Sequence, residues 1–181
     1  MKKSIDKAEK TEYNGIEVIL GDICYPKSEA LIIPANSKGI MNRDLPSNII
    51  KDGFAGISKE VKAIVSNNNI EVGQCFSTGA GRLKRRGLKK IYHTVIKRLQ
   101  SDFTSLYIVN NALNNVLGTV VRDKMKSVAV CGLGIDDGNL DKKSVARITV
   151  EICKRYSKKI KIKIIDSNEE FIREVSNLVK E

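Results

Sequence analysis

Short apolar runs alternate with longer amphipathic stretches along this chain. Runs rich in β-branched residues are typical of strands, and they lie at 16–20, 30–33, 75–78, 91–95, 128–131 and 160–165. Between them apolar residues recur every three or four positions, as in helices, at 47–51, 57–65, 103–121, 144–156 and 169–179. Alternating strands and helices favour helices packed on both faces of one sheet. We therefore predict a three-layer α/β/α sandwich around a mostly parallel or mixed sheet of about six strands.

The longest of these helical patterns begins in an apolar position. Phe103, Leu106, Leu113, Leu117 and Val120 share one face of a helix drawn over 103–121. We therefore predict one amphipathic helix over this range.

The length of 181 residues fits one domain. Residues 1–14 lack periodicity, so we predict a polar, frayed lead-in followed by a single domain over 15–181. The charged N-terminus has no apolar signal-peptide core, and the apolar run near Leu31 is broken by Pro34 and Asn36. We expect a cytoplasmic protein without a membrane span.

The cysteines and the single histidine do not form a metal-binding pattern. Cys24, Cys75, Cys131 and Cys153 lie far apart without a CxxC pair, and His93 is the only histidine. We interpret the cysteines as small buried residues in a reducing compartment, and expect neither metal nor cofactor. His93 lies inside a predicted strand, which favours a structural role over that of a general base.

Positive charge favours an anionic partner. The chain has 32 Lys and Arg against 21 Asp and Glu, a net charge of +11, and eight cations without an acid lie between Arg82 and Arg98. This run has two interpretations, a solvated surface or a nucleic-acid-binding patch. Aromatic residues, which stack on bases in many nucleic-acid grooves, make up only 5% of the chain.

Three loops follow predicted strands, at 21–23, 36–46 and 132–139, where ligands bind in α/β sheets. Asp22 could accept hydrogen bonds from a ligand amino group or from local backbone. Asn36 could bind a ligand or shape a turn. The glycine-rich segment 131–138 could form an anion-binding concavity or an ordinary turn. Asp136 and Asp137 lack the further ligands that a divalent metal needs.

Together the three motifs, in this order, resemble the macrodomain family, which binds ADP-ribose and in some branches hydrolyses ADP-ribose esters. The matching residues are Gly21-Asp22-Ile23, the segment Glu29 to Ser37 (EALIIPANS), and Ser127 to Gly134 (SVAVCGLG). The similarity continues through 72–83 and 90–95 and covers nearly all of 16–180.

The resemblance implies a role for each motif. Asp22 would receive the adenine amino group, with Ile23 beside it, and Asn36 would lie at the distal ribose. The diphosphate would be wrapped by the backbone amides of the second loop, namely Gly132, Leu133, Gly134, Ile135 and Asp136. The implied partners are ADP-ribose or a related nucleotide, either alone or attached to a protein.

The resemblance leaves hydrolysis open. The family's glycine run is replaced here by residues 40–46, and Pro46 stands where many hydrolases have an aspartate. Asp136 falls where an aromatic residue is common. If the protein is an ADP-ribosyl hydrolase, Asn36 would position a water or a ribose hydroxyl, and Asp44 or Asp136 would be the general base.

Two other functions compete with ADP-ribose binding. One is a nucleic-acid-binding module that keeps the fold but binds RNA or DNA through the 82–98 surface. The other is a sensor for a different NAD-derived nucleotide.

Overall fold

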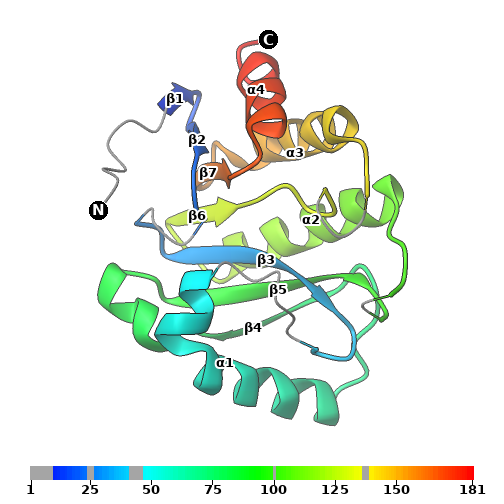
Figure 1. The fold of residues 1–181 in the computed structure, drawn as a ribbon. Coiled ribbons are helices and arrows are strands. Elements are labelled where there is room, and N and C mark those ends of the chain that lie inside the picture. Colours follow the sequence, from blue (N-terminus) through cyan, green and yellow to red (C-terminus); the bar gives the residue numbers. More distant parts are fainter. Residues whose placement is uncertain (1–9, 24–26, 41–46, 100, 136–138) are drawn as a thin grey trace, which may run out of the picture.

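The computed structural model describes residues 10–23, 27–40, 47–99, 101–135 and 139–181, which form one mixed sheet with helices on both faces (Figure 1). The strands are β1 (Lys10–Tyr13), β2 (Ile16–Leu20), β3 (Ala30–Asn36), β4 (Cys75–Gly79), β5 (Lys90–Lys97), β6 (Ser127–Val130) and β7 (Lys161–Asp166). The helices are α1 (Ser47–Asn67), the 3₁₀ helix η1 (Gly81–Arg86), α2 (Leu106–Arg122), α3 (Lys142–Tyr156) and α4 (Glu169–Leu178).

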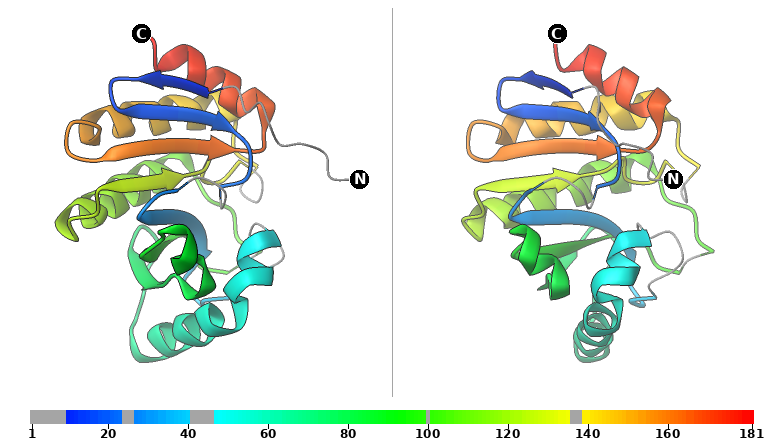
Figure 2. Two further views of the ribbon diagram at one scale, coloured as in Figure 1. Left: turned by 90° about the vertical axis from the view of Figure 1, so that its left-hand side faces the viewer. Right: turned by 60° about the vertical axis from the view of Figure 1, so that its left-hand side comes forward.

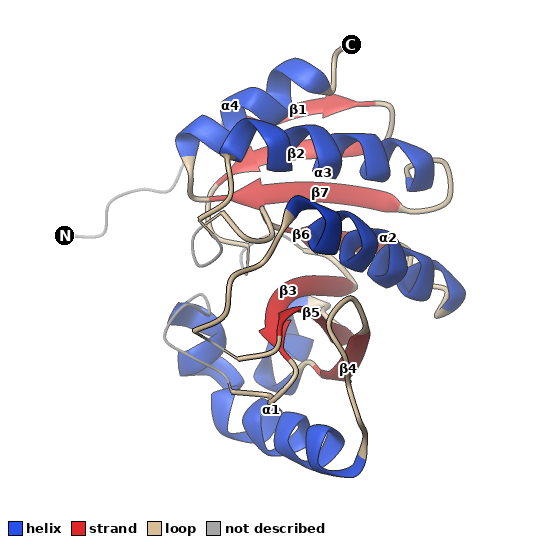
Figure 3. Cartoon of the chain, turned by 90° about the vertical axis from the view of Figure 1, so that its right-hand side faces the viewer, coloured by secondary structure: helices blue, strands red, loops and turns tan. Residues whose placement is uncertain are grey.

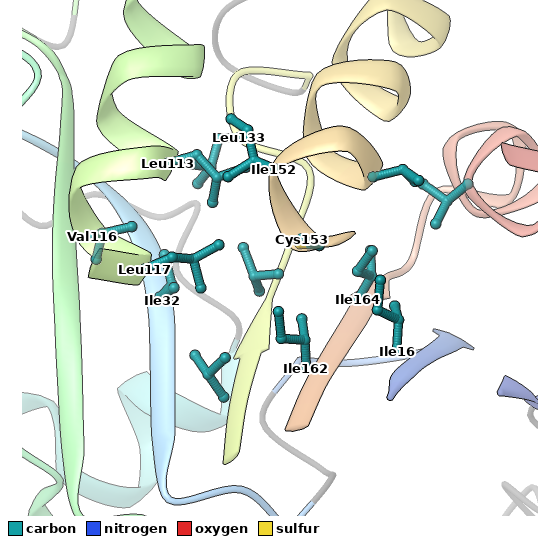
Figure 4. Close-up of a cluster of buried hydrophobic side chains, with 14 of the residues drawn as sticks. Ile16, Ile32, Leu113, Val116, Leu117, Leu133, Ile152, Cys153, Ile162 and Ile164 are labelled. Carbon is teal, nitrogen blue, oxygen red and sulfur yellow. The ribbon is translucent and has the colours of Figure 1, made fainter. Parts of the chain in front are cut away.

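The strand order is β1-β2-β7-β6-β3-β5-β4. Five neighbours, from β2 to β5, are parallel, and β1 and β4 close the two sides as antiparallel strands. One face packs under α2, α3 and α4, which Figure 3 shows in front of the strands; residues of this larger core, such as Leu113 and Ile164, appear in Figure 4. The other face packs under α1 and η1 around Leu31, Ile57 and Leu83. These are the three layers that the sequence predicts.

The sheet changes its direction of winding between β3 and β6. From β3 the chain crosses through α1 to β4, on one side, whereas from β6 it crosses through α3 to β7, on the other. The two strands pair only over Ala30–Ile32 and Val128–Val130, and β3 then continues alone along β5. Pro34, which has no N–H to donate, lies just beyond the last β3–β6 pair. A reversal of this kind is where open α/β sheets bind ligands.

The predicted fold class is confirmed, with corrections at the ends of elements. The sheet has seven strands because residues 10–13, which we assigned to the lead-in, pair as β1 with β2. The two helical stretches predicted over 47–51 and 57–65 are parts of the single helix α1. Phe103 is 88% exposed, not buried, since α2 begins only at Leu106, after the N-cap Ser105.

His93 is a buried structural residue in the middle of β5. Its Nε2 lies 2.9 Å from the Thr78 hydroxyl on β4, and its ring stacks on Phe76 with centroids 4.8 Å apart. Burial lowers the pKa of His93 from 6.5 to about 3, so the imidazole stays neutral near pH 7. This environment supports the structural role that we predicted.

The depressed pKa predicts acid sensitivity. Below its ordinary pKa of 6.5, the unfolded chain takes up a proton at His93 that the folded chain does not. Stability is therefore fully present above that pH and falls as the pH drops, by up to about 1.4 kcal/mol per pH unit. Urea unfolding between about pH 6.5 and pH 5, above most carboxyl titration, should show this slope in the native protein and a flatter one in His93→Gln. Equal slopes would mean that another group causes the loss.

Candidate functional site

Three of the loops at the carboxyl edge of the sheet meet at Asp166, the last residue of β7. Asp166 is 7% exposed. Its carboxylate accepts the N–H of Gly132, after β6, at 3.0 Å and the N–H of Asn168, before α4, at 2.9 Å. Its backbone carbonyl accepts the N–H of Gly21, after β2, at 2.9 Å. One buried carboxylate residue thus ties the ends of β2, β6 and β7 together.

This arrangement bears on the glycine-rich loop. The Gly132 N–H, for which the resemblance implies a diphosphate partner, donates to the Asp166 carboxylate in this structure. The side chains of Leu133 and Ile135 are buried in the larger core, so this loop turns its apolar groups inward. Between Leu133 and Ile135, the atoms left to face a ligand are therefore those of the main chain.

The glycines of this loop are required by the protein's own packing. Gly134 has φ +85°, and a Cβ there would lie 3.0 Å from Leu140 and 3.2 Å from Thr104. A Cβ on Gly132 would lie 2.7 Å from Ile135. A side chain at Gly132 or Gly134 would therefore require the ends of neighbouring side chains to shift.

The first loop divides its residues between surface and core. Ile23 is 6% exposed and packs in the smaller core under α1. Asp22 is half-buried and directly follows Gly21, whose N–H donates to the backbone carbonyl of Asp166. Asp22 therefore lies beside the ends of β2 and β7, at the same edge as the glycine-rich loop.

Asn36 organises the loop that follows β3. It is 3% exposed, and its Oδ1 accepts the N–H groups of Lys38 and Ile40, both at 3.1 Å. Its Nδ2 donates to the Ile40 carbonyl at 2.7 Å. The oxygen thus uses both of its lone pairs on the loop backbone. This geometry favours the turn-forming role among the two that the sequence left open.

Comparison with known protein families identifies the family of this chain. The family model described as Macro domain matches residues 32–149, which include β3 from Ile32 onward, all of β6 and the segments after both strands. The chain belongs to the macro domain family. A relative from Aquifex aeolicus (strain VF5), described as an uncharacterized protein, is 28% identical over 159 residues, which are 87% of this chain and 93% of that protein.

Solved macrodomains share the fold at low identity. The macrodomain of Mycobacterium tuberculosis DarG is 20% identical with a TM-score of 0.72, over 82% of this chain and 95% of that one. An Oceanobacillus iheyensis macrodomain with MES bound is 16% identical with a TM-score of 0.79, over 96% of each chain. Thermosipho africanus DarTG in complex with ADP-ribose is 16% identical with a TM-score of 0.73, over 92% of this chain and 46% of that one.

The remaining candidate residues of this macro domain are not all placed. Asp44, Pro46 and Asp136 lie outside the described residues. Within the part that is described, no three His, Cys, Asp or Glu side chains cluster as metal ligands would. The described helices also include none with the length and apolar character to cross a membrane.

Asp166 is the site residue that sequence reasoning missed. The sequence does contain a signal for this residue. Asp166 directly follows the predicted strand 160–165, and the segment after it, Asn168-Glu169-Glu170, is typical of a helix N-terminus. Asn168 does cap α4, through its Oδ1 and the Phe171 N–H at 3.0 Å. What the sequence does not reveal is that the carboxylate reaches back across the sheet to Gly132.

A pair of glycine substitutions tests whether packing shapes the glycine-rich loop. Gly134→Ala and Gly73→Ala both place a side chain at positive φ, a strain of about 1–2 kcal/mol, but nothing lies within 4 Å of a Cβ at Gly73. We expect Gly134→Ala to lose about 1 kcal/mol more stability in urea unfolding, the lower end of typical overpacking costs. Equal losses of stability in the two variants would show that the neighbours of Gly134 make room for a Cβ without destabilising the fold.

Proposed function

We propose that this macro domain binds ADP-ribose at the carboxyl edge of the sheet, where β3 and β6 separate. The observation that carries the proposal is the family match, because residues 32–149 include most of β3, all of β6 and the segments that follow these strands. Related folds have been solved with such ligands: Oceanobacillus iheyensis macrodomains with ADPR and with ADP, and Thermosipho africanus DarTG with ADP-ribose. The ligand would be ADP-ribose alone or attached to a protein.

We assign the adenine end of the ligand to the first loop. Asp22 carries a half-buried carboxylate next to the ends of β2 and β7, and a carboxylate can accept the hydrogen bond of an exocyclic amino group. The hydrogen bond from Gly21 to Asp166 supports this assignment, since it holds the backbone of Asp22 against the neighbouring strand.

We assign the diphosphate to the main chain from Leu133 through Ile135. Inward packing of the two apolar side chains and the positive φ of Gly134 support a backbone that faces outward, as in other anion-binding concavities. The buried carboxylate of Asp166 would repel phosphate at close range, but two backbone N–H groups already neutralise part of its charge.

We further propose that the protein is a binder with slow hydrolysis or none. Asn36 binds its own loop backbone, which supports a scaffold role at the distal ribose over one in activating water. The sequence also has Pro46, which cannot transfer a proton, where the resemblance places an acid of hydrolases.

Calorimetric titration with ADP-ribose tests the binding assignment. We expect Asp22→Ala to weaken binding by about 1–3 kcal/mol, the scale of a lost hydrogen bond to a charged group. Glu151→Ala, which removes an exposed carboxylate from α3, is the matched control and should keep the native affinity. Unchanged affinity in Asp22→Ala would remove Asp22 from the site, and absence of binding by the native protein would overturn the proposed function.

Release of ADP-ribose from a mono-ADP-ribosylated protein tests the binder assignment. General acid–base assistance typically supplies about 10²–10⁴-fold, so a site without it should release ADP-ribose slowly or not at all. Asn36→Ala should lose thermal stability through its three loop hydrogen bonds. Rapid turnover by the native protein that disappears in a folded Asn36→Ala variant would instead identify a hydrolase.

A further inference from the structure

The structure divides the basic run of the sequence between two opposite edges of the sheet. Strand β5 separates Lys90 from Lys97 by about 23 Å, at about 3.3 Å per residue. Lys97 and Arg98 therefore lie at the carboxyl edge. The other six cations, in η1 and at the start of β5, lie at the opposite edge, where the parallel strands begin. We call this the amino edge; it is the end toward the tails of the β2, β6 and β7 arrows in the left view of Figure 2.

Two further basic turns, distant in sequence, reach the same amino edge. The turn between α2 and β6 contributes Arg122, Lys124 and Lys126, and the turn between α3 and β7 contributes Lys158, Lys159 and Lys161. All six side chains are exposed. The order of the strands places these turns side by side, because β6 and β7 are neighbours.

Hydrogen bonds fix the spacing along the amino edge. The Lys161 N–H donates to the Lys126 carbonyl at 3.2 Å, and the Lys126 N–H donates to Glu29 Oε2 at 2.9 Å. Glu29, just before β3, also accepts the Lys89 ammonium at 2.7 Å. Strands β7, β6, β3 and β5 thus begin in one row of about 15 Å, the length of roughly four base pairs of duplex.

This edge carries most of the chain's excess charge. Residues 82–90, 122–126 and 158–161 together with Glu29 contain 12 of the 32 Lys and Arg but only 2 of the 21 Asp and Glu, namely Glu29 and Asp123. Both carboxylates are ion-paired, Asp123 with Lys90 at 2.8 Å, and hydrogen bonds from Lys89 and Lys90 hold the pKa of Glu29 and of Asp123, respectively, below the usual values. They therefore remain anionic near neutral pH and offset only a small part of the positive charge.

Helix stabilisation does not account for this accumulation. Cations favour helix C-termini, which explains Arg122 at the end of α2. Arg82, Lys84 and Arg85 instead belong to a 3₁₀ helix of six residues, and Lys126 and Lys161 stand where strands begin. Most of the twelve cations thus lie outside the last turn of any α-helix.

We propose that the amino edge binds the phosphate backbone of duplex nucleic acid, on a surface separate from the proposed ADP-ribose site. The twelve cations match a polyphosphate. Among described residues, the only large hydrophobic side chain exposed near this edge is Tyr13, at 40%. The described residues of this edge therefore include neither the aromatic platform of single-strand binders nor the apolar centre of most protein interfaces. Contacts limited to phosphates imply binding independent of sequence.

Fluorescence anisotropy of the full chain with a 20-base-pair duplex of arbitrary sequence, as DNA and as RNA, tests the proposal across about 50–200 mM salt. For four phosphate contacts, the slope of log K against log salt should be about −3.6 on DNA. The variant Lys126→Gln with Lys161→Gln should bind at least tenfold more weakly at about 100 mM salt, with the slope reduced by about 1.8. Binding of either duplex supports the proposal, and their ratio distinguishes DNA from RNA as the source of phosphate.

The matched control is Arg147→Gln with Arg173→Gln, which removes the same charge from exposed positions on α3 and α4 and should stay within twofold of native binding. Thermal unfolding of both variants checks that they fold. An equal loss in the control, no duplex binding, or equal competition by polyglutamate or anionic vesicles would overturn the proposal. Saturating ADP-ribose should leave duplex affinity unchanged, and competition would show that the surfaces overlap. The duplex measurement needs no ADP-ribose binding, so either proposal can fail alone.

Discussion

The parallel pairing of five neighbouring strands determines where everything else in this protein lies. Parallel pairing requires the chain to return from the end of one strand to the start of the next, so α2 and α3 begin at one edge of the sheet and end at the other. The segments that follow β2, β3 and β6 therefore leave one edge, while short basic turns enter the other. A single constraint on strand direction thus separates a candidate nucleotide site from a cationic surface.

The candidate site takes its shape from the core more than from its own surface residues. The Asp166 carboxylate accepts the backbone N–H groups of Gly132 and Asn168. Gly134 lies close to Leu140, Thr104 and the first turn of α2. The described part of this loop, from Gly132 to Ile135, is therefore positioned by contacts within the protein itself. Substitutions in this loop should accordingly affect folding and binding together.

Local patterns in the sequence identify most of the strands and helices but not the contacts between them. The β-branched runs predict β2 through β7, because buried strands need such side chains. Strand β1, with the sequence KTEY, lies at the side of the sheet and carries no apolar alternation, so composition does not reveal it. Phe103 fits a helical period but precedes the N-cap Ser105, and a local cap outweighs periodicity.

In the candidate site, too, local motifs identify single residues but not the contacts between distant ones. The positions of Asp22, Asn36 and Gly134 follow from motifs at strand ends, whereas the bond from Asp166 to Gly132 joins residues 34 positions apart. The basic run 82–98 looks continuous in sequence, and only the direction of β5 shows that its ends are far apart. Long-range pairing is the information that single-sequence patterns do not contain.

Pro34 has a consequence for how this protein behaves at high concentration. Beyond Ile32, strand β3 pairs with β5 on one side, while its pairing with β6 has ended. A stretch of strand with one open side is a template on which a strand from another molecule can add. Pro34 is exposed in the middle of that stretch and lacks the N–H that an added strand would need. At this position β3 therefore offers no N–H to a strand of a second molecule.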